Sequence, residues 1–286
     1  WEAQRKEIDM ATVNFSRREI QSKLVYYGPG MCGKTTNLQT VHSKVSEKIR
    51  GNLTSVATQQ DRTLFFDLLP LDLGKVMGFT IRLQLYTVPG QVYYNASRKI
   101  VLQGVDGVVF VADSQQGKME ENRESLKNLF ENLKELGVDP DTIPMVLQYN
   151  KRDLNPIYSV EELNRELNHH GYPWFESIAT TGHGVFDTLK SISSIVVKDI
   201  RTKLEKSEKI KAVQKQANPA PQKRSITDRA DSPQTSSSAT AVSHQNSIAE
   251  PAAGNLESVE VRYDEDEGSL LAVSYTHLRA HETKAN

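Results

Sequence analysis

The chain has 286 residues, a formal net charge of -1 and one cysteine. This length fits one domain of ordinary size with a tail, and the balanced charge gives no bulk attraction to nucleic acid or to an anionic membrane. A lone cysteine cannot form an internal disulfide, which is typical of a reducing compartment. The sequence also lacks an apolar run of about 18 residues, the length expected of a transmembrane helix. We therefore expect a cytoplasmic protein.

Both ends of the chain are expected to lie outside the folded domain. Residues 1–9 are charged and precede Met10, so we interpret them as upstream read-through. Residues 206–286 contain stretches rich in Ser, Thr, Gln and Ala. Such stretches bury too little apolar surface to order themselves, so we expect a disordered tail. Its last part, about 272–286, resembles translated sequencing-adapter sequence and is expected to be artefactual. The folded domain is predicted to cover 10–205.

A phosphate-binding loop stands near the start of this domain. Residues 28–35 (GPGMCGKT) fit the pattern G-x-x-x-x-G-K-[ST], between a strand predicted at 20–27 and a helix predicted at 36–49. That context makes the pattern specific, because the backbone N–H groups of such a loop converge on an anion at a helix N-terminus. Lys34 is expected to reach the β/γ-phosphates, and the Thr35 hydroxyl is expected to ligate Mg²⁺. The predicted phosphate-binding residues of this stretch are Gly28, Pro29, Gly30, Met31, Cys32, Gly33, Lys34, Thr35 and Thr36.

Strand-like and helical segments alternate through the rest of the domain. The strands predicted at 63–73 and 78–88 are separated by a short link, so they are expected to form an antiparallel hairpin, with Pro70 placing the first at the sheet edge. The remaining predicted strands are 107–112, 143–149 and 172–177, and the remaining helices are 96–102, 118–136, 160–167 and 185–203. This pattern predicts a doubly wound α/β fold. We expect a mixed sheet of about six strands, mostly parallel with one antiparallel edge strand, and a ligand at the carboxyl ends of the strands.

Residues 150–153 (NKRD) follow a buried strand and fit N-K-x-D, the guanine-recognition pattern. The Asp153 carboxylate can accept hydrogen bonds from guanine N1–H and the exocyclic amine, whereas adenine would leave it unpaired. A basic loop after a strand can produce this tetrapeptide alone, but its place after a phosphate loop in the same α/β series favours guanine. Residues 177–180 (SIAT) can supply a backbone N–H to guanine O6. The predicted guanine-binding residues are Asn150, Lys151, Asp153, Ala179 and Thr180.

Thr63 arrives after a long loop, at the start of a predicted strand. A first-switch threonine in this position ligates Mg²⁺ and senses the γ-phosphate. Thr35 and Thr63 are therefore the predicted metal ligands. A plain threonine at the start of a strand is the alternative interpretation of Thr63.

Residues 87–91 (TVPGQ) stand where D-x-x-G-Q is expected, with Thr87 in place of the aspartate. Gly90 can turn its N–H toward the γ-phosphate, and Gln91 can orient the attacking water. Because Thr87 carries no carboxylate, we expect Mg²⁺ to be held with less support than usual. Hydrolysis without a partner is therefore expected to be slow.

Most of residues 10–205 resemble the bacterial MglA-type gliding-motility GTPases, a Ras-like family. The resemblance is carried by NFSRREIQSKLVYYGPGMCGKTTNL, DRTLFFDLLPLDLG, TVPGQVYYNASRKIVLQGVDGVVFVADS, QYNKRD and SIATTGHGVFDTL. Threonine at the start of the D-x-x-G segment is itself a feature of that family. The resemblance implies a Ras-like fold and a GTP/GDP switch that hydrolyses GTP with Mg²⁺.

The resemblance also implies residue roles and partners. It makes Gln91 the water-positioning residue, Thr63 the switch-one ligand, and Arg62 an arginine supplied within the chain to the transition state. A solvated or partner-contacting arginine is the alternative for Arg62. The resemblance further implies a roadblock-domain GTPase-activating partner, and recruitment to cell poles in the control of polarity for gliding or type IV pili.

Two other functions remain open on the sequence. One is a GTP-binding scaffold that recruits polarity or pilus proteins and hydrolyses little. The other is a P-loop ATPase or small-molecule kinase, which Lys151 and Asp153 disfavour.

Overall fold

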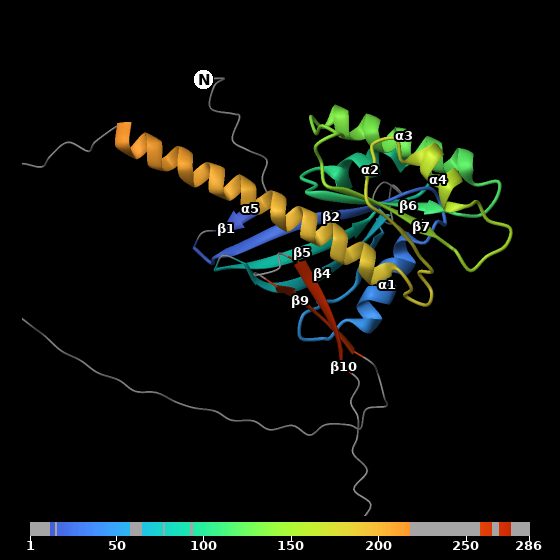
Figure 1. The fold of residues 1–286 in the computed structure, drawn as a ribbon, viewed down its shortest axis with the longest axis horizontal. Helices are drawn as coiled ribbons and strands as arrows, with labels where there is room; N and C mark the ends of the chain where they lie inside the picture. The colour runs from blue at the N-terminus through green and yellow to red at the C-terminus, as the bar shows by residue number, and fades with distance from the viewer. Residues whose placement is uncertain are drawn as a thin grey trace, which may run out of the picture. The chain divides into compact units, whose positions relative to one another are not determined.

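The structure, a computed structural model, describes residues 12–14, 16–57, 65–76, 78–91, 94–217, 258–264 and 269–275. Within these residues, one eight-stranded sheet has the order β3-β4-β5-β2-β6-β7-β8, with β1 paired to β2 (Figure 1). Its strands are β1 (Thr12–Asn14), β2 (Glu19–Tyr27), β3 (Thr54–Ala57), β4 (Phe65–Val76), β5 (Phe79–Thr87), β6 (Gly107–Asp113), β7 (Met145–Asn150) and β8 (Trp174–Glu176). The helices are α1 (Lys34–Lys44), α2 (Asn95–Leu102), α3 (Met119–Glu135), α4 (Val160–Leu167) and α5 (Val185–Ala217). The predicted α/β fold is confirmed.

The centre of the sheet is parallel and buried. β2 pairs in parallel with β5 and β6, and β6 pairs in parallel with β7. Every residue of β6 and β7 is buried, as expected of near-continuous apolar strands covered on both faces. The carboxyl ends of β2, β6 and β7 therefore meet at one edge of the sheet, at Tyr27, Asp113 and Asn150. This edge is where an open α/β sheet places its ligand.

One face of the sheet is covered by α2, α3 and α4 (Figure 1). Their buried leucines, such as Leu129 of α3 and Leu163 of α4, join Phe110 of β6 in one apolar cluster. The amphipathic spacing predicted for α3 therefore faces the core, because residues three and four apart lie on one side of a helix.

The other face is covered by α1 and the domain part of α5. Gln148 of β7 donates hydrogen bonds to Asn37 of α1 at 3.0 Å and to Thr188 of α5 at 3.1 Å. A Cβ atom added at Gly107 would lie 2.6 Å from a methyl carbon of Val196. The absence of a side chain at Gly107 therefore lets α5 approach β6 closely.

The sheet has more strands than the sequence predicted, and β4 is not its edge. β3 pairs antiparallel with residues 65–68 of β4 and takes the edge instead. Pro70 lies just past this pairing, and its carbonyl accepts the Gly51 N–H at 2.9 Å, a contact that needs no proline N–H. Strands of three or four residues, as β1 and β3 are, offer too few positions for a periodic pattern to predict them. Similarly, α1 ends at Lys44 rather than residue 49, because Val45 is extended (φ -82°, ψ 140°).

Some residues of the predicted tail have regular structure. Contacts divide the chain into two units, residues 1–203 with 257–286 and residues 204–256. In the second unit, the described residues continue α5 to Ala217. In the first, β9 (Ser258–Asp264) pairs antiparallel with β10 (Ser269–Tyr275), whose β-branched and aromatic residues suit strands. The remaining predictions for the tail, and the interpretation of residues 1–9, fall outside the described residues.

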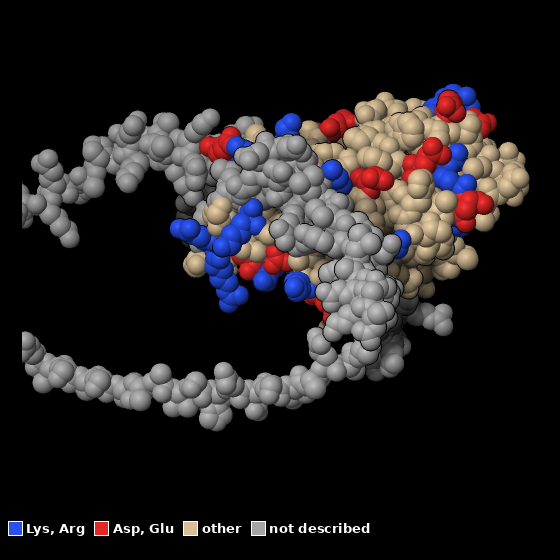
Figure 2. Space-filling model, turned by 60° about the horizontal axis from the view of Figure 1, so that its bottom comes forward, with Lys and Arg blue, Asp and Glu red and all other residues tan. Residues whose placement is uncertain are grey.

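Charged side chains are unevenly spread on the face that Figure 2 presents. Several Lys and Arg side chains gather at the left of the view, while Lys, Arg, Asp and Glu are interspersed at its right. Across the described part of the chain, no helix combines the length and apolar character needed to cross a bilayer.

The close approach at Gly107 yields a stability prediction. Gly107→Val should lower the free energy of unfolding by about 1–3 kcal/mol, because overpacking forces β6 and α5 apart. Gly107→Ala should have a smaller effect of the same sign. Urea denaturation of the two variants checks this ordering, and equal stability of Gly107→Val and the parent chain would contradict the packing described here.

Candidate nucleotide-binding site

The phosphate-binding loop joins β2 to α1, and two of its glycines are required by the backbone. Gly28 has φ +150°, and a Cβ there would lie 2.2 Å from the carbonyl oxygen of Val111. Gly33 has φ +105°, and a Cβ there would lie 2.2 Å from Nδ2 of Asn150. Glycine alone tolerates both the conformation and the close approach. The loop pattern therefore reflects how tightly this turn packs against β6 and β7.

The first turn of α1 is built to receive an anion. Gly33 is the N-cap, no side chain caps the helix, and the first turn carries no acidic residue. The N–H groups of a helix N-terminus and the positive end of the helix dipole then point toward the loop. Thr35 and Thr36 follow directly, as predicted, and Met31 stands exposed at the tip of the loop with φ 60°.

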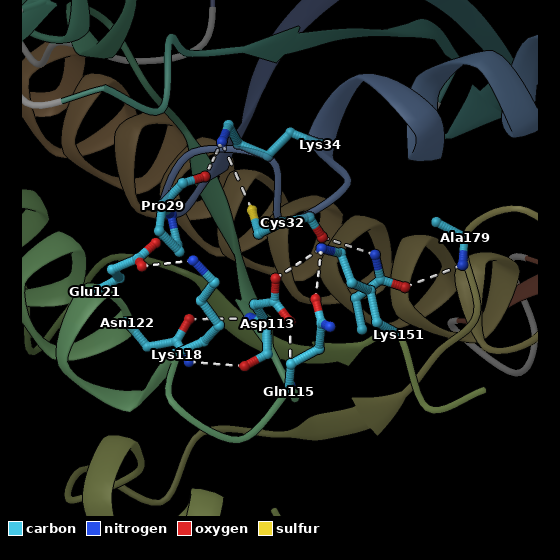
Figure 3. A network of polar contacts seen from close by, with 11 residues as sticks. Pro29, Cys32, Lys34, Asp113, Gln115, Lys118, Glu121, Asn122, Lys151 and Ala179 are labelled. Atoms are coloured by element: carbon cyan, nitrogen blue, oxygen red, sulfur yellow. Dashed lines mark hydrogen bonds and ion pairs between the residues drawn. The ribbon is translucent and has the colours of Figure 1, made fainter. Parts of the chain in front are cut away.

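Lys34 lies buried within the loop. Its Nζ donates a hydrogen bond to the carbonyl oxygen of Gly28 at 2.9 Å. It also donates to the carbonyl oxygen of Pro29 at 2.6 Å and lies 3.6 Å from Sγ of Cys32 (Figure 3). Burial lowers the pKa of Lys34, and burial likewise raises the pKa of the Cys32 thiol. A phosphate entering the loop would stabilise the lysine charge that burial disfavours.

A carboxylate that the sequence analysis missed lies beside Thr35 and Thr87. Asp67 of β4 is 4% exposed, and its Oδ2 accepts hydrogen bonds from the Thr35 hydroxyl at 2.7 Å and the Thr87 hydroxyl at 2.9 Å. Its Oδ1 accepts from the Ser55 hydroxyl of β3 at 2.6 Å. Weak carboxylate support for Mg²⁺ was expected only because position 87 is a threonine. The neighbouring strand supplies a carboxylate at this point.

These groups fit a magnesium ion. Mg²⁺ is bound in proteins through one or two carboxylates and hydroxyls together with substrate phosphates, rather than by an all-protein cage. Thr35 and Asp67 supply one hydroxyl and one carboxylate, and no cluster of three or more His, Cys, Asp or Glu side chains suited to a metal occurs among the described residues. The predicted ligand Thr63, and Arg62 beside it, lie outside the described residues.

At the other end of the site, Asn150 ties three loops together. Its Nδ2 donates to the carbonyl of Cys32 at 2.7 Å, while its Oδ1 accepts from the Ser177 hydroxyl at 3.0 Å and the Ala179 N–H at 2.9 Å. Figure 3 labels two of these partners, Cys32 and Ala179. The Ala179 N–H, one of the backbone donors of residues 177–180 that were predicted to serve guanine O6, is therefore engaged by Asn150. Thr180, the next residue, is exposed.

Lys151 and Asp153 flank this junction. Lys151 has φ 67°, and its Nζ contacts Oδ2 of Asp113 at 2.7 Å and Oε1 of Gln115 at 3.2 Å (Figure 3). Asp113 at the end of β6 thus fixes the lysine that was predicted to lie over the base. Asp153 is exposed, which leaves its carboxylate accessible to a ligand.

The segment after β5 lies directly on the phosphate loop. A Cβ added at Gly90 would lie 2.4 Å from the Cα of Gly30 and 2.7 Å from the carbonyl oxygen of Pro29. A cavity of about 550 Å³ lies here, within the range of small-ligand sites. Its described lining includes the predicted residues Gly30, Met31, Gly33, Lys34, Thr35, Thr36, Gly90 and Gln91, together with Asp67 and Thr87. The predicted phosphate loop and the predicted residues Gly90 and Gln91 therefore line the same cavity.

These features define a P-loop protein of the small-GTPase class. A family model described as the ADP-ribosylation factor (Arf) family matches residues 9–196, and the chain belongs to this family. It is 56% identical over 192 residues to the mutual gliding-motility protein MglA of Myxococcus xanthus (strain DK1622), a match that covers 67% of this chain and 98% of that relative. The resemblance to MglA-type Ras-like GTPases is thereby confirmed, and a GTP-dependent switch is the activity of this class.

Asp67 yields a prediction about the metal. Asp67→Asn keeps the shape of the side chain but removes its charge, so Mg²⁺ should strengthen GDP binding about 10- to 100-fold less than in the parent chain. GDP affinity without Mg²⁺ should change little. Fluorescent GDP titration with and without EDTA measures both values. Asp72→Asn, a partly exposed carboxylate of the same strand, is the matched control, and equal magnesium dependence in both variants would refute the assignment.

Proposed function

We propose that this protein is a GTP/GDP switch that regulates cell polarity and surface motility, by analogy with its relative, the mutual gliding-motility protein MglA. The observation that carries the proposal is the hydrogen bond from Asn150 to the Cys32 carbonyl, which joins the loop of residues 150–153 to the loop of residues 28–35. This bond fixes the distance between the two loops, as a nucleotide that contacts both of them requires. We also propose that the protein is cytoplasmic and is recruited to cell poles.

The phosphates would be held by the loop of residues 28–35. Backbone N–H groups at the start of α1 would receive them, and the Lys34 ammonium would exchange its carbonyl partners for phosphate oxygens. The Asp153 carboxylate would pair with the N1–H and amine of guanine, with Lys151 over the ring. A backbone N–H at Thr180, or that of Ala179 released from Asn150, would donate to O6.

A bound Mg²⁺ would supply positive charge to offset the charge that develops on the phosphates. Thr35 would hold it by its hydroxyl, with Thr63 as the first-switch ligand. Asp67 would bind the ion directly or through a water molecule. The Thr87 and Ser55 hydroxyls, which already bond to Asp67, would keep that carboxylate oriented.

Hydrolysis would rest on positioning. The Gly90 N–H would meet the γ-phosphate, Gln91 would orient the attacking water, and Arg62 would stabilise the charge of the transition state. Gln91 is exposed, and its side chain makes no hydrogen bond within the described part of the chain. We therefore propose slow turnover alone and faster turnover with a roadblock-domain activating partner that fixes these side chains.

A second candidate function is a GTP-binding scaffold with little hydrolysis that recruits polarity or pilus proteins. The exposed position of Gln91 favours it, because a glutamine that is not held in place orients water poorly. In both cases the γ-phosphate would select the partner-binding shape. The two differ in whether a partner raises the rate of phosphate release.

The catalytic role of Arg62 can be tested by single turnover. Arg62→Ala should leave GTP affinity within about threefold and lower partner-stimulated hydrolysis about 10³-fold, the range measured for arginine fingers. Arg17→Ala, an exposed arginine near β1, serves as the control. Undiminished stimulated turnover in Arg62→Ala would remove the residue from the mechanism, and a parent chain that no partner stimulates would favour the scaffold.

Base selectivity has its own test. The parent chain should bind GTP in preference to ATP, and Asp153→Ala should reduce that preference about tenfold or more, because adenine makes no use of the carboxylate. Competition of both nucleotides against fluorescent GDP gives the ratio. Equal affinities in the parent chain would point to a P-loop ATPase or kinase instead.

A further inference from the structure

Arg98 is a buried arginine whose partners belong to the segment after β5. It lies in α2 and is 2% exposed. Its Nε donates to the carbonyl oxygen of Pro89 at 2.9 Å, and its Nη2 donates to that of Gly90 at 2.6 Å. No ion pair joins Arg98 to an acidic side chain among the described residues. The positive charge of Arg98 is instead compensated by its hydrogen bonds to oxygen atoms. A hydrogen bond is stronger when its donor is ionised.

The far side of the guanidinium is anchored. Its Nη1 donates to Oδ1 of Asn128 in α3 at 2.7 Å, and the same oxygen accepts from the Tyr27 hydroxyl at 2.6 Å. Asn132 donates to both Tyr27 and Asn128 at 3.2 Å. Tyr27 immediately precedes the phosphate loop. The anchor therefore joins α2 and α3 to the base of that loop.

Holding these two carbonyls fixes the orientation of two peptide groups. In a planar trans peptide, the C=O of one residue and the N–H of the next point in opposite directions. The Pro89 carbonyl points toward Arg98, so the Gly90 N–H points away from it. Arg98 lines a cavity of about 560 Å³ between the loop and α3, and it is not among the described residues that line the phosphate-side cavity. Gly90 lines both.

We propose that Arg98 is the positioning residue of the switch, clamping the Pro89–Gly90 turn so that the Gly90 N–H and Gln91 face the phosphate site. This inference rests on the proposed GTPase function. The turn is held between the Arg98 fork on one side and Gly30 on the other, since Gly90 packs against Gly30 without room for a side chain. Arg98 touches no reacting atom and acts through the turn.

A purely electrostatic role makes a different prediction. Burial is the main cause that lowers the pKa of Lys34, and the Arg98 charge adds to it, so this charge is felt at the phosphate loop. Lysine at position 98 keeps the charge but lacks the planar fork that reaches two carbonyls at once. Arg98→Lys therefore separates the clamp from the charge.

The test uses Arg98→Lys and Arg98→Met, with Arg82→Lys on the exposed face of β5 as the matched control. Because a misplaced catalytic group loses about 100-fold in rate, partner-stimulated hydrolysis should fall about 10- to 100-fold in Arg98→Lys. The ratio of GTP-analogue to GDP affinity should fall about tenfold, as a hydrogen bond to the γ-phosphate is lost while GDP binding is retained. Arg82→Lys should match the parent chain in both.

Two results would overturn the clamp. One is parent-like hydrolysis and affinity ratio in Arg98→Lys, which would leave only a role for the charge. The other is an equal loss of GDP and GTP-analogue affinity with a lowered melting temperature, which a merely structural arginine would produce. If Arg98→Met fails to fold, the results for Arg98→Lys alone decide whether the clamp is correct.

A separate readout distinguishes failure of the clamp from failure of the proposed function. Backbone NMR order parameters of Gly90 and Gln91 in the nucleotide-free chain should be lower in Arg98→Lys than in the parent. Unchanged order parameters there would refute the clamp even if GTP is bound and hydrolysed. A parent chain that binds no guanine nucleotide would refute the proposed function, while lower order parameters would still establish that Arg98 holds the turn.

Discussion

The arrangement of the site depends on one buried amide, that of Asn150. It accepts from Ser177 and Ala179 and donates to the Cys32 carbonyl, so that loops after β2, β7 and β8 share a single side chain. Removing it would leave these groups unpaired in the interior, at about 1–3 kcal/mol each. Three loops far apart in sequence are thereby joined into one surface. Little of the binding free energy then has to be spent on ordering them.

The opposite end of the site is held by strand pairing instead. Asp67 reaches Thr35 because β4 runs beside β5, and Ser55 of the edge strand β3 supports the same carboxylate. The Pro89–Gly90 turn is likewise held from outside, by α2 and α3. The groups proposed to bind the base are thus joined through one side chain, while those proposed to surround the terminal phosphate are held by separate neighbouring elements. That division would suit a switch, which must keep its nucleotide while changing shape.

The backbone requirements of the predicted phosphate loop are local, and for that reason the sequence reveals them. Gly28 and Gly33 are needed by a positive φ and by contacts with the backbone of β6 and the side chain of Asn150, so their spacing is visible in the chain itself. Asp67 was missed because its role comes from a partner on another strand, and position 87 alone suggests that a carboxylate is lacking. An aspartate inside the apolar run FFDLLPL was the available signal. Arg98 gives no comparable signal, since a helix surface commonly carries arginine and only the fold brings it to the turn.

The hydroxyl of Thr87 both donates to the Asp67 carboxylate and accepts the Asp67 N–H, each at 2.9 Å. An aspartate at position 87 would face a second carboxylate across this gap and would lose the donor. Like charges so close cannot both ionise freely, and one of the two pKa values would rise. The threonine instead pairs with a carboxylate that stands on the adjacent strand. Thr87→Asp alone would therefore place two carboxylates side by side, and would not restore an ordinary D-x-x-G site.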